Sequence, residues 1–461
     1  MSKLDLIIIG AGPGGYCAAV RASQLGLKTA VIEKDNPGGV CLNWGCIPSK
    51  NLIHQAELFH SLHEMEQVGV KIGRSGLNYS QVQAKSRQVV KTLTGGVASL
   101  LKKNKVNYIK GTAKVTGKGE VTVDGTKYKA KNIMVATGSR PMNIPGFEFD
   151  EELVLSSSGI LAMTELPKSI VILGAGAIGC EFAYIMNSFG VKVTLVEFAD
   201  HILPSEDFET TAVLARCFKR DGIEVLTKTK AKTLSKMADS VTVTIEGANG
   251  EQQITADKAL VVFGRIPNTQ GLGLQEMGVK LDERGYVQIA NYCQTHSANI
   301  YAIGDITNTP ALAHVASKEG EMAVEHMAGL KPHTLKVDAN DVPSAIYCEP
   351  QVAGFGLRED KAIIDSIKIK KSVFNYAGAG KTIAVGKPDG LVKIICDAQT
   401  NEILGAHIVG HCATELLHEL LLAKHSELLP EDIESMIHAH PTISEAIMEA
   451  ARGINGKPIH G

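Results

Sequence analysis

The apolar and polar positions follow the same order in two parts of the chain. An apolar run at 6–9 meets a glycine-rich turn, a helix-periodic stretch follows, and a second apolar run ends at Glu33. The same order returns without a gap at 170–197, at an offset of 164 residues, the step from Gly10 to Gly174. A short apolar run, a turn, a helix and a second apolar run predict a β-α-β unit with parallel strands. The pattern therefore predicts two α/β units of one kind.

Shorter apolar runs occur along the rest of the chain. A β-rich stretch at 106–128 precedes strands that end at Gly138, Gly264 and Asp305, and a helical stretch covers 311–329. Asp305 is an acid at the carboxyl end of an apolar strand, where open α/β sheets bind ligands. From residue 341 onward the pattern predicts a separate α+β domain. Its segments are alternating runs at 372–380, 390–397 and 403–410 and helices at 414–425 and 443–452.

Composition narrows the class of protein. With 461 residues, 44% of them hydrophobic and 21% charged, the chain has room for about three domains. Its net charge of −2 gives no argument for nucleic acid or an anionic membrane, and no apolar run reaches the roughly 20 residues of a membrane span. The start of the chain predicts a first strand rather than a signal peptide. Nine cysteines, an odd number, favour a reducing, cytoplasmic location with most thiols free.

Both repeated units carry a G-x-G-x-x-G turn between the strand and the helix. The first glycine allows a tight turn, the second lets the backbone approach a pyrophosphate, and the third permits close helix–strand packing. The diphosphate then meets the N–H groups of a helix N-terminus. A lone motif of this kind is often a plain turn, but two copies with matching surroundings predict two dinucleotide sites. The glycines are Gly10, Gly12 and Gly15 in the first unit and Gly174, Gly176 and Gly179 in the second.

An acid ends the second strand of each unit. Glu33 and Glu197 both stand 23 residues after the first glycine of their turn. A carboxylate at this place can accept hydrogen bonds from a ribose 2′-OH. Because it would repel a 2′-phosphate, Glu197 favours NAD over NADP. The plainer alternative is a surface acid at a strand end.

Two cysteines, Cys41 and Cys46, lie close together in GGVCLNWGCIPSK. A zinc site is disfavoured because no second pair follows at ligand spacing. In a regular helix, residues five apart would have Cα atoms over about 8 Å apart, beyond the roughly 7 Å limit for a disulfide. A bridge therefore needs a bent segment, for which Gly45 supplies the freedom, and a bridge in distorted backbone is easily reduced. Two unrelated buried cysteines are the remaining alternative.

At this point the sequence resembles a known family over essentially its whole length. The cysteine motif, the two glycine turns, IYAIGD and HAHPTISE are together similar to the pyridine nucleotide–disulfide oxidoreductases, and among them to the dihydrolipoamide dehydrogenases. The resemblance implies FAD in the first unit, NAD in the second and a redox-active Cys41–Cys46 disulfide. Cys41 would exchange with the substrate and Cys46 would face the flavin. Lys50 would be a cation near the flavin ring, with a solvated lysine as the alternative.

The resemblance also assigns the remaining site residues. Asp305 would bind the ribityl or phosphate part of FAD, His440 would be the catalytic base and Glu445 would orient it. A histidine suits thiol exchange because it titrates near neutrality, and a carboxylate can fix its tautomer. As a bare motif, a histidine with a glutamate five residues on is usually a chance pairing. The other positions expected to contact a cofactor are Thr137, Gly138, Ser139, Glu181, Gly264 and Ala313.

The expected architecture is α/β, with two Rossmann-like dinucleotide-binding domains and a C-terminal α+β dimerisation domain. Family members are homodimers in which the C-terminal domain supplies the base to the other subunit. The expected domains are an FAD-binding domain at 1–147, an NAD-binding domain at 148–272, a central domain at 273–340 that completes the FAD site, and an interface domain at 341–461.

Within the family, the substrate is expected to be protein-bound dihydrolipoamide. Glutathione-type reductases carry basic residues where this chain has Glu197, mercuric reductases end in a cysteine pair, and transhydrogenase relatives lack the paired cysteine. The expected partners are lipoyl domains of 2-oxo acid dehydrogenase or glycine cleavage complexes, between which the sequence does not choose. The rival hypothesis is a catalytically silent flavoprotein that serves as a binding subunit.

Three further features carry no assigned function. The stretch 375–382 resembles a phosphate loop but lacks its first glycine, and the strand-like residues 382–390 follow it instead of a helix. His411, His418 and His425 recur every seven residues, which indicates a helix face more than a metal site. Trp44, the only tryptophan, either shapes substrate access or packs.

Overall fold

The chain divides into two compact units. The computed structural model describes residues 4–71 and 76–460. Each unit collects segments that are far apart in the sequence, and the finer division into four domains stays a prediction. The first unit comprises Met1–Asn51, Ser80–Met142 and Gly264–Ala339, and the second comprises Leu52–Tyr79, Asn143–Phe263 and Asn340–Gly461.

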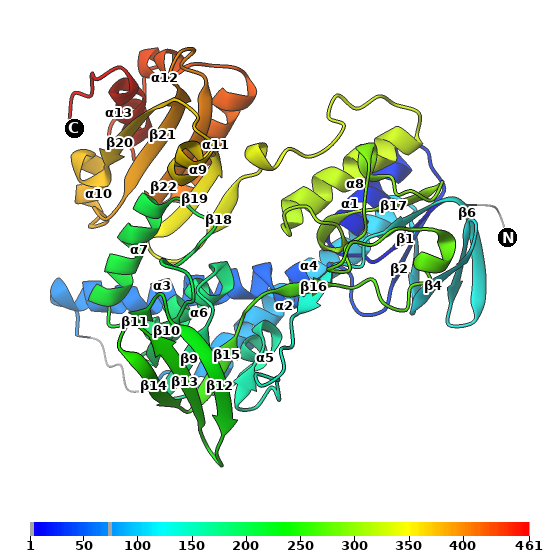
Figure 1. Ribbon diagram of the computed structural model, residues 1–461, viewed down its shortest axis with the longest axis horizontal. Coiled ribbons are helices and arrows are strands. Elements are labelled where there is room, and N and C mark those ends of the chain that lie inside the picture. Colours follow the sequence, from blue (N-terminus) through cyan, green and yellow to red (C-terminus); the bar gives the residue numbers. More distant parts are fainter. Residues whose placement is uncertain (1–3, 72–75, 461) are drawn as a thin grey trace. The chain divides into compact units, whose positions relative to one another are not determined.

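A seven-stranded sheet with a parallel centre forms the core of the first unit. Its elements are β1 (Leu4–Ile9), β2 (Thr29–Glu33), β3 (Asn107–Lys110), β4 (Ala113–Gly117), β5 (Glu120–Val123), β6 (Thr126–Val135), β17 (Ile300–Ala302), and the helices α1 (Pro13–Gln24) and α8 (Ala313–Met327). The strands run in the order β3-β2-β1-β6, β17 also pairs with β6, and all these pairs are parallel. β5 and β4 continue from β6 in antiparallel pairing. Helices α1 and α8 lie side by side against this sheet (Figure 1).

The sequence of β1 explains why its apolar run is continuous. Leu6 and Ile8 pack in one core cluster with Ala18 of α1, whereas Ile7 and Ile9 pack in another. Successive side chains of a strand point to opposite faces, so a strand covered on both faces needs apolar residues throughout.

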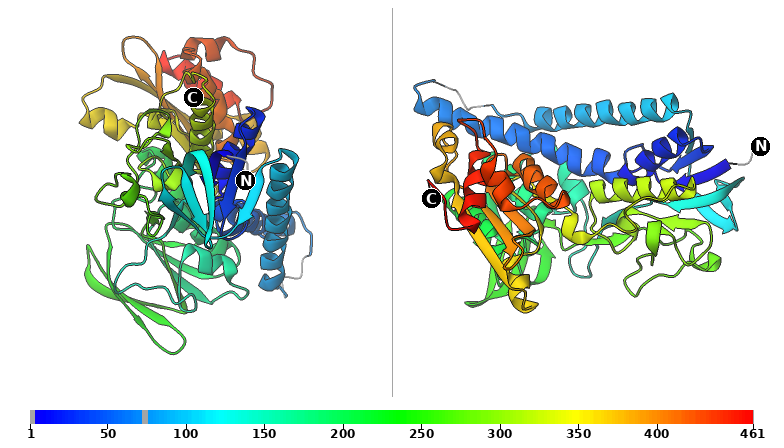
Figure 2. Two further views of the ribbon diagram at one scale, coloured as in Figure 1. Left: turned by 90° about the vertical axis from the view of Figure 1, so that its right-hand side faces the viewer. Right: turned by 90° about the horizontal axis from the view of Figure 1, so that it is seen from above.

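Three more helices extend the first unit around the cysteine motif. They are α2 (Gly39–Trp44), α3 (Cys46–Gln67), which continues into the second unit, and α4 (Tyr79–Lys103). Figure 2 shows α4 as one long uninterrupted helix. A short antiparallel pair, β7 (Ser139–Pro141) with β16 (Arg265–Pro267), also belongs to this unit. No helix in the described ranges is long and apolar enough to cross a membrane.

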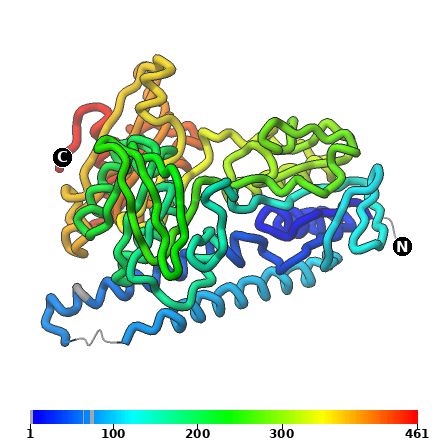
Figure 3. Tube along the Cα trace, turned by 60° about the horizontal axis from the view of Figure 1, so that its bottom comes forward, coloured from blue at the N-terminus to red at the C-terminus, as the bar shows by residue number. Residues whose placement is uncertain are grey.

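The second unit contains a five-stranded parallel sheet of the same type. Its elements are β8 (Val154–Leu155), β9 (Ser169–Leu173), β10 (Lys192–Val196), β11 (Glu224–Leu226), β15 (Lys258–Val261), and the helices α5 (Ser157–Ala162), α6 (Ala177–Ser188) and α7 (Phe208–Arg220). The strand order is β11-β10-β9-β15-β8. An antiparallel meander stands beside it in Figure 3 and consists of β12 (Lys230–Lys236), β13 (Val241–Gly247) and β14 (Gly250–Ala256).

The C-terminal part of the second unit is an antiparallel sheet covered by helices. Its strands run in the order β18 (Ser344–Ile346), β19 (Gln351–Gly356), β22 (Ile403–Gly410), β21 (Leu391–Asp397), β20 (Ile369–Asn375). The helices are α9 (Glu359–Ile364), α10 (Gly380–Ala384), α11 (Ala413–His425), α12 (Pro430–Ser435) and α13 (Glu445–Ile454). Leu417 of α11 and Ile447 of α13 share one core cluster with Ile394 and Ile408 of the sheet.

The predicted repeat and the α/β class are confirmed. Helices α1 and α6 begin and end at positions that differ by the predicted 164 residues, Pro13 against Ala177 and Gln24 against Ser188. The expectation of a strand at 382–390 is wrong. The short helix α10 forms there, because Thr382 donates hydrogen bonds to the carbonyls of Tyr376 and Ala379.

Candidate active site

The glycine turn of the first unit has the shape that the motif predicts. Gly10 has φ +104°, and a Cβ there would lie 2.3 Å from the carbonyl oxygen of Ala136 on the neighbouring strand. A Cβ on Gly15 would lie 1.9 Å from the carbonyl oxygen of Gly10. At Gly12 the nearest atom is the Cα of Gly39, at 3.8 Å. The first and third glycines are therefore required by the chain itself, and the second leaves room in front of the turn.

The second unit repeats this geometry. Gly174 has φ +105°, and a Cβ on Gly179 would lie 1.9 Å from the carbonyl oxygen of Gly174. A Cβ on Gly176 would meet no atom within 4 Å. Open space at the second glycine, at the N-terminus of α6, fits a pyrophosphate that approaches the backbone closely.

Glu33 and Glu197 each accept a hydrogen bond from a backbone N–H of the glycine turn in their unit. Oε2 of Glu33 accepts a hydrogen bond of 2.8 Å from the N–H of Ala11, within the glycine turn. Oε2 of Glu197 accepts one of 2.7 Å from the N–H of Ala175. Each carboxylate is thereby held beside its turn at the carboxyl end of the second strand, where a ribose would lie next to a pyrophosphate.

The two cysteines stand on either side of a helix break. Helix α2 ends at Trp44, Gly45 has φ −153° and ψ −114°, and α3 begins at Cys46. The predicted bend at Gly45 is confirmed. The side chains of Cys41 and Cys46 are close enough to form a hydrogen bond across this break. The side-chain hydrogen bond with Cys46 raises the pKa of Cys41 well above its ordinary value, and burial adds to this effect.

Helix α2, which carries Cys41, packs against the first glycine turn. Gly39, the first residue of α2, has φ +58°, and a Cβ there would lie 2.6 Å from the Cα of Gly12. The N–H of Gly38 donates to the carbonyl of Ala11 at 2.7 Å. Lys50, one turn into α3, lies near enough to Cys41 to lower the pKa of that thiol, although the raising effects prevail. The redox pair therefore lies next to the first dinucleotide turn.

Ser139, Asp305 and Arg265 form a polar cluster at the carboxyl end of this sheet. The hydroxyl of Ser139 donates to Oδ2 of Asp305 at 2.5 Å, and Nε of Arg265 donates to Oγ of Ser139 at 2.7 Å. Burial lowers the pKa of Arg265, while nearby Asp305 and Cys46 act in the opposite sense. The cluster thus joins three segments that are distant in sequence and lies close to the cysteine pair.

Further predicted positions surround this cluster. Thr137 donates from its hydroxyl to the carbonyl of Asn268, and Gly138 has φ +67° with no atom near its Cβ direction. The carbonyl of Gly264, just before β16, accepts from the N–H of Met142. Ala313 is the first residue of α8, a helix that packs closely on α1 beside the turn.

Sequence reasoning did not identify Arg265 and Glu319. Glu319 of α8 is buried and accepts a hydrogen bond of 2.7 Å from the N–H of Gly304. Burial raises the pKa of Glu319 to about 7. Arg265 directly follows Gly264, and Glu319 is an acid on a buried helical stripe, but neither signal separates these residues from ordinary charged positions.

The histidine pair lies in the second unit. Nδ1 of His440 is 3.0 Å from Oε1 of Glu445, and Oε2 of Glu445 accepts from the N–H of Thr442 at 2.9 Å. Burial opposes ionisation of Glu445, but the Thr442 N–H and the His440 ring outweigh it and lower the pKa of this carboxyl. The side chain of His440 is 76% exposed in the single chain. Glu181 of α6 is buried and accepts from the N–H of Tyr347 at 3.2 Å.

The C-terminal histidines form no metal centre in the part of the chain that the structure describes, where no group of three or more metal-ligating side chains occurs. His418 and His425 belong to α11, and His411 lies just before it with its Nδ1 3.5 Å from Oε2 of Glu349. The expected histidine-bearing helix face is therefore present for two of the three residues.

Comparison with known proteins gives the family. The family model described as pyridine nucleotide-disulphide oxidoreductase matches residues 4–320, and the model of its dimerisation domain matches residues 342–451. Proteins named dihydrolipoyl dehydrogenase from Bacillus subtilis and Thermus scotoductus are each 42% identical, over 100% of this chain and 99% of theirs. A crystal structure of LpdA from Mycobacterium tuberculosis has a TM-score of 0.90 at 26% identity and covers 98% of this chain and 100% of that one.

The chain belongs to the pyridine nucleotide-disulphide oxidoreductase family. It is a flavoprotein disulfide oxidoreductase with a dimerisation domain, and its cofactors are FAD and NAD. Both glycine turns fit a dinucleotide, because each combines an open second glycine with an acid held beside the turn.

Proposed function

We propose that the chain is an NAD-dependent dihydrolipoyl dehydrogenase, which oxidises a protein-bound dihydrolipoyl group to the lipoyl disulfide. The observation that carries the proposal is the cysteine pair across the Gly45 break, on a helix that packs against the first dinucleotide turn. The names of the relatives in Bacillus subtilis and Thermus scotoductus support the choice of substrate.

The thiol chemistry balances on the residues of this chain. A substrate thiolate attacks Sγ of Cys41, the Cys41–Cys46 bond breaks, and Cys46 leaves as a thiolate. The second substrate thiol then attacks the substrate sulfur of the mixed disulfide, which releases Cys41 and closes the lipoyl ring. Two electrons and two protons pass to the enzyme in this exchange. The side-chain hydrogen bond between Cys41 and Cys46 supports the roles, because it raises the pKa of the Cys41 thiol.

His440 would take the proton of the attacking thiol. A carboxylate at Nδ1 holds the proton on that nitrogen and leaves Nε2 free to accept another. The 3.0 Å contact with Glu445 supports this arrangement. Glu445 is held in turn by the Thr442 N–H, so it orients the ring and does not itself meet the substrate.

FAD would supply the acceptor for the electron pair of the dithiol and the hydride donor to NAD⁺. We assign FAD to the first turn and NAD⁺ to the second. Glu33 and Glu197 would bind the two riboses, the Ser139–Asp305–Arg265 cluster would bind the ribityl or phosphate part of FAD, and Lys50 would stabilise charge on its ring. The remaining residues assigned to cofactor contacts are Thr137, Gly138, Gly264 and Ala313 for FAD and Glu181 for NAD⁺.

A direct assay tests the function. Wild-type protein loaded with FAD should reduce NAD⁺ with free dihydrolipoamide, and Cys41→Ser should abolish this turnover. Wild-type protein that holds both cofactors and still fails to turn over would instead support the catalytically silent flavoprotein.

We further propose that the active site is shared between the subunits of a homodimer, with His440 of one chain over Cys41 of the other. The exposure of His440 in the single chain and the dimerisation domain support this. The expected partners are lipoyl domains of 2-oxo acid dehydrogenase or glycine cleavage complexes, and the expected location is cytoplasmic.

Mixing two inactive variants tests the shared site. Cys46→Ser and His440→Ala, reassorted in equal amounts, form mixed dimers in about half of all cases, each with one site free of both defects. Activity should recover to about a quarter of wild type. If mass spectrometry shows mixed dimers and activity stays at zero, each site is built within one chain.

A further inference from the structure

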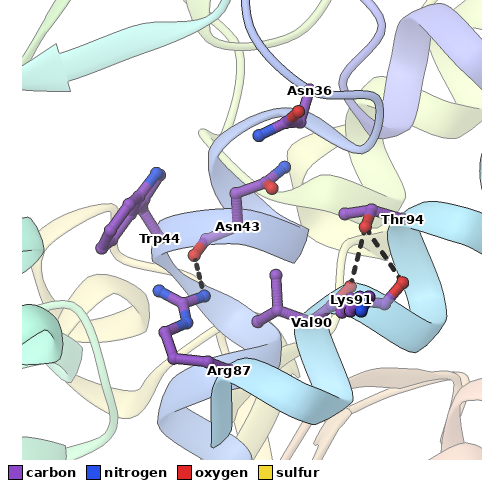
Figure 4. A pocket seen from close by; sticks show the side chains of 7 residues that line it. All are labelled: Asn36, Asn43, Trp44, Arg87, Val90, Lys91 and Thr94. Carbon is purple, nitrogen blue, oxygen red and sulfur yellow. Dashed lines mark hydrogen bonds between the residues drawn. The ribbon is translucent and has the colours of Figure 1, made fainter. Parts of the chain in front are cut away.

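A basic pocket lies beside helix α2, which carries Cys41, in the first unit. It has a volume of about 330 Å³ and lies between α2 and α4 (Figure 4). Arg87 and Lys91 of α4 contribute two cations, Trp44 and Asn43 of α2 face them, and no acidic residue lines the pocket. We call it the Trp44 pocket.

Arg87 is held in place by α2. Its Nη2 donates to the carbonyl of Asn43 at 2.5 Å, and its guanidinium carbon lies 4.5 Å from the centre of the Trp44 ring. Its Nη1 is buried without a hydrogen-bond partner among the described residues. Burial also lowers the pKa of Arg87. The guanidinium is therefore fixed between the Asn43 carbonyl and the Trp44 ring, and it adds positive charge to the wall of the pocket.

The pocket is tied to the reacting cysteine through α2. Trp44 stands three residues after Cys41, on the neighbouring part of the same helix surface. Val40 and Trp44 are each 42% exposed and four residues apart, so they form an exposed apolar pair on the helix that carries Cys41. The apolar pair suits an aliphatic arm, and the adjacent cations suit acidic side chains.

Helix α4 extends the positive charge. Its part next to the pocket, residues 79–91, contains three basic residues and no acidic one, in a chain whose net charge is −2. These residues are Lys85, Arg87 and Lys91. An unbalanced basic helix beside a reaction centre steers an acidic partner toward it.

We propose that the Trp44 pocket and the adjoining surface of α4 dock an acidic face of the carrier domain that presents the dihydrolipoyl arm. Carboxylates of the carrier bind Lys91 next to the fixed charge of Arg87, and the arm passes over Val40 and Trp44 toward Cys41. The proposal rests on the proposed function and adds a recognition site for the carrier protein, separate from the chemistry at the disulfide.

The test compares two substrates that share the reacting dithiol. One is a reduced lipoyl domain of acidic isoelectric point, and the other is free dihydrolipoamide, which carries no charge. In Lys91→Glu, kcat/KM for the domain should fall about three- to tenfold at low ionic strength, since rim charges change association more than chemistry. The value for free dihydrolipoamide should stay the same, because this substrate has no carboxylate to contact Lys91.

A matched control is Lys103→Glu, which makes the same change of net charge near the end of α4, about 18 Å along the helix from Lys91. It should affect neither substrate by more than about twofold. Added salt should weaken turnover of the domain in wild type and much less in Lys91→Glu.

Three outcomes would overturn the docking surface. One is an equal loss on both substrates in Lys91→Glu, and another is an equal effect of Lys103→Glu. The third is that Lys91→Glu abolishes binding to phosphatidylglycerol vesicles or to DNA and leaves the lipoyl domain unaffected. If wild type does not oxidise free dihydrolipoamide at all, the proposed function itself fails, and this result differs from all three.

Discussion

In the glycine turn of the second unit, one glycine is required for folding and another is required for binding of the nucleotide. Gly176 and Gly179 belong to one motif, but their surroundings differ. A Cβ at Gly179 would collide with the carbonyl oxygen of Gly174 at 1.9 Å, whereas a Cβ at Gly176 would meet no atom within 4 Å. Gly176 also has φ −72° and ψ −173°, which alanine adopts without strain. We therefore predict opposite consequences for the same substitution at the two sites.

The expected magnitudes follow from these distances. Gly179→Ala forces the turn apart and should cost about 1–3 kcal/mol by overpacking. For a unit of this size that corresponds to a loss of roughly 2–12 °C in Tm, at about 2–4 °C per kcal/mol. Gly176→Ala should leave Tm unchanged. Its methyl group would stand where the pyrophosphate approaches, and losing one charge-assisted hydrogen bond of about 1.5–3 kcal/mol raises Kd for NAD⁺ about tenfold or more.

Two measurements check the pair. Thermal unfolding at one scan rate gives the Tm of both variants and the wild type, and titration with NAD⁺ gives the Kd. Gly176→Ala should retain the wild-type Tm and lose NAD⁺ affinity, while FAD content stays the same because the first turn is untouched. The reasoning is refuted if Gly176→Ala binds NAD⁺ as tightly as wild type, or if both variants lose the same Tm.

Further predictions concern the acid, the two sulfurs and a buried lysine. Replacing Glu197 by alanine should lower the preference for NAD⁺ over NADP⁺ by about tenfold, because a 2′-phosphate no longer meets a carboxylate, and an unchanged ratio would remove Glu197 from this role. Cys41→Ser should show a long-wavelength absorption band from the Cys46 thiolate beside oxidised flavin, and Cys46→Ser should not. Identical spectra for the two variants would contradict the assignment of Cys46 as the sulfur that faces the flavin. Lys393 is 1% exposed with its Nζ 2.9 Å from buried Asp207, so Lys393→Met should cost about 3–5 kcal/mol in thermal unfolding, and Asp207→Asn in the same chain should restore part of it.

The repeated unit and the bend between the cysteines could be predicted because both follow from local geometry. The glycine spacing fixes where a strand must turn into a helix, and φ is nearly the same at Gly10 and Gly174, +104° and +105°. The bend follows from the distance limit of a disulfide, and a glycine within the motif marks where it occurs. The break found at Gly45 confirms that argument.

Other parts of the site could not be predicted because they depend on contacts between distant segments. Arg265 reaches Ser139 across 126 residues, and nothing in the sequence around either residue indicates the pairing. Buried Glu319 accepts a hydrogen bond from the N–H of Gly304, and this contact forms only when α8 packs against the segment that contains Gly304. In the short helix at 380–384, the hydroxyl of Thr382 likewise donates to the carbonyls of Tyr376 and Ala379, contacts that appear only in the folded chain.

The two turns share one geometry, so their different tasks must come from what surrounds them. In the first unit α2 packs against the turn, because a Cβ on Gly39 would lie only 2.6 Å from the Cα of Gly12. In the second unit a Cβ on Gly176 would meet no atom within 4 Å. A turn packed against α2 suits a cofactor that stays bound during electron transfer from the cysteine pair. An open turn suits a cosubstrate that must leave after each turnover. We infer that α2, the element inserted after the first β-α-β unit, makes this difference, since it packs against one nucleotide turn and carries Cys41 in the same six residues.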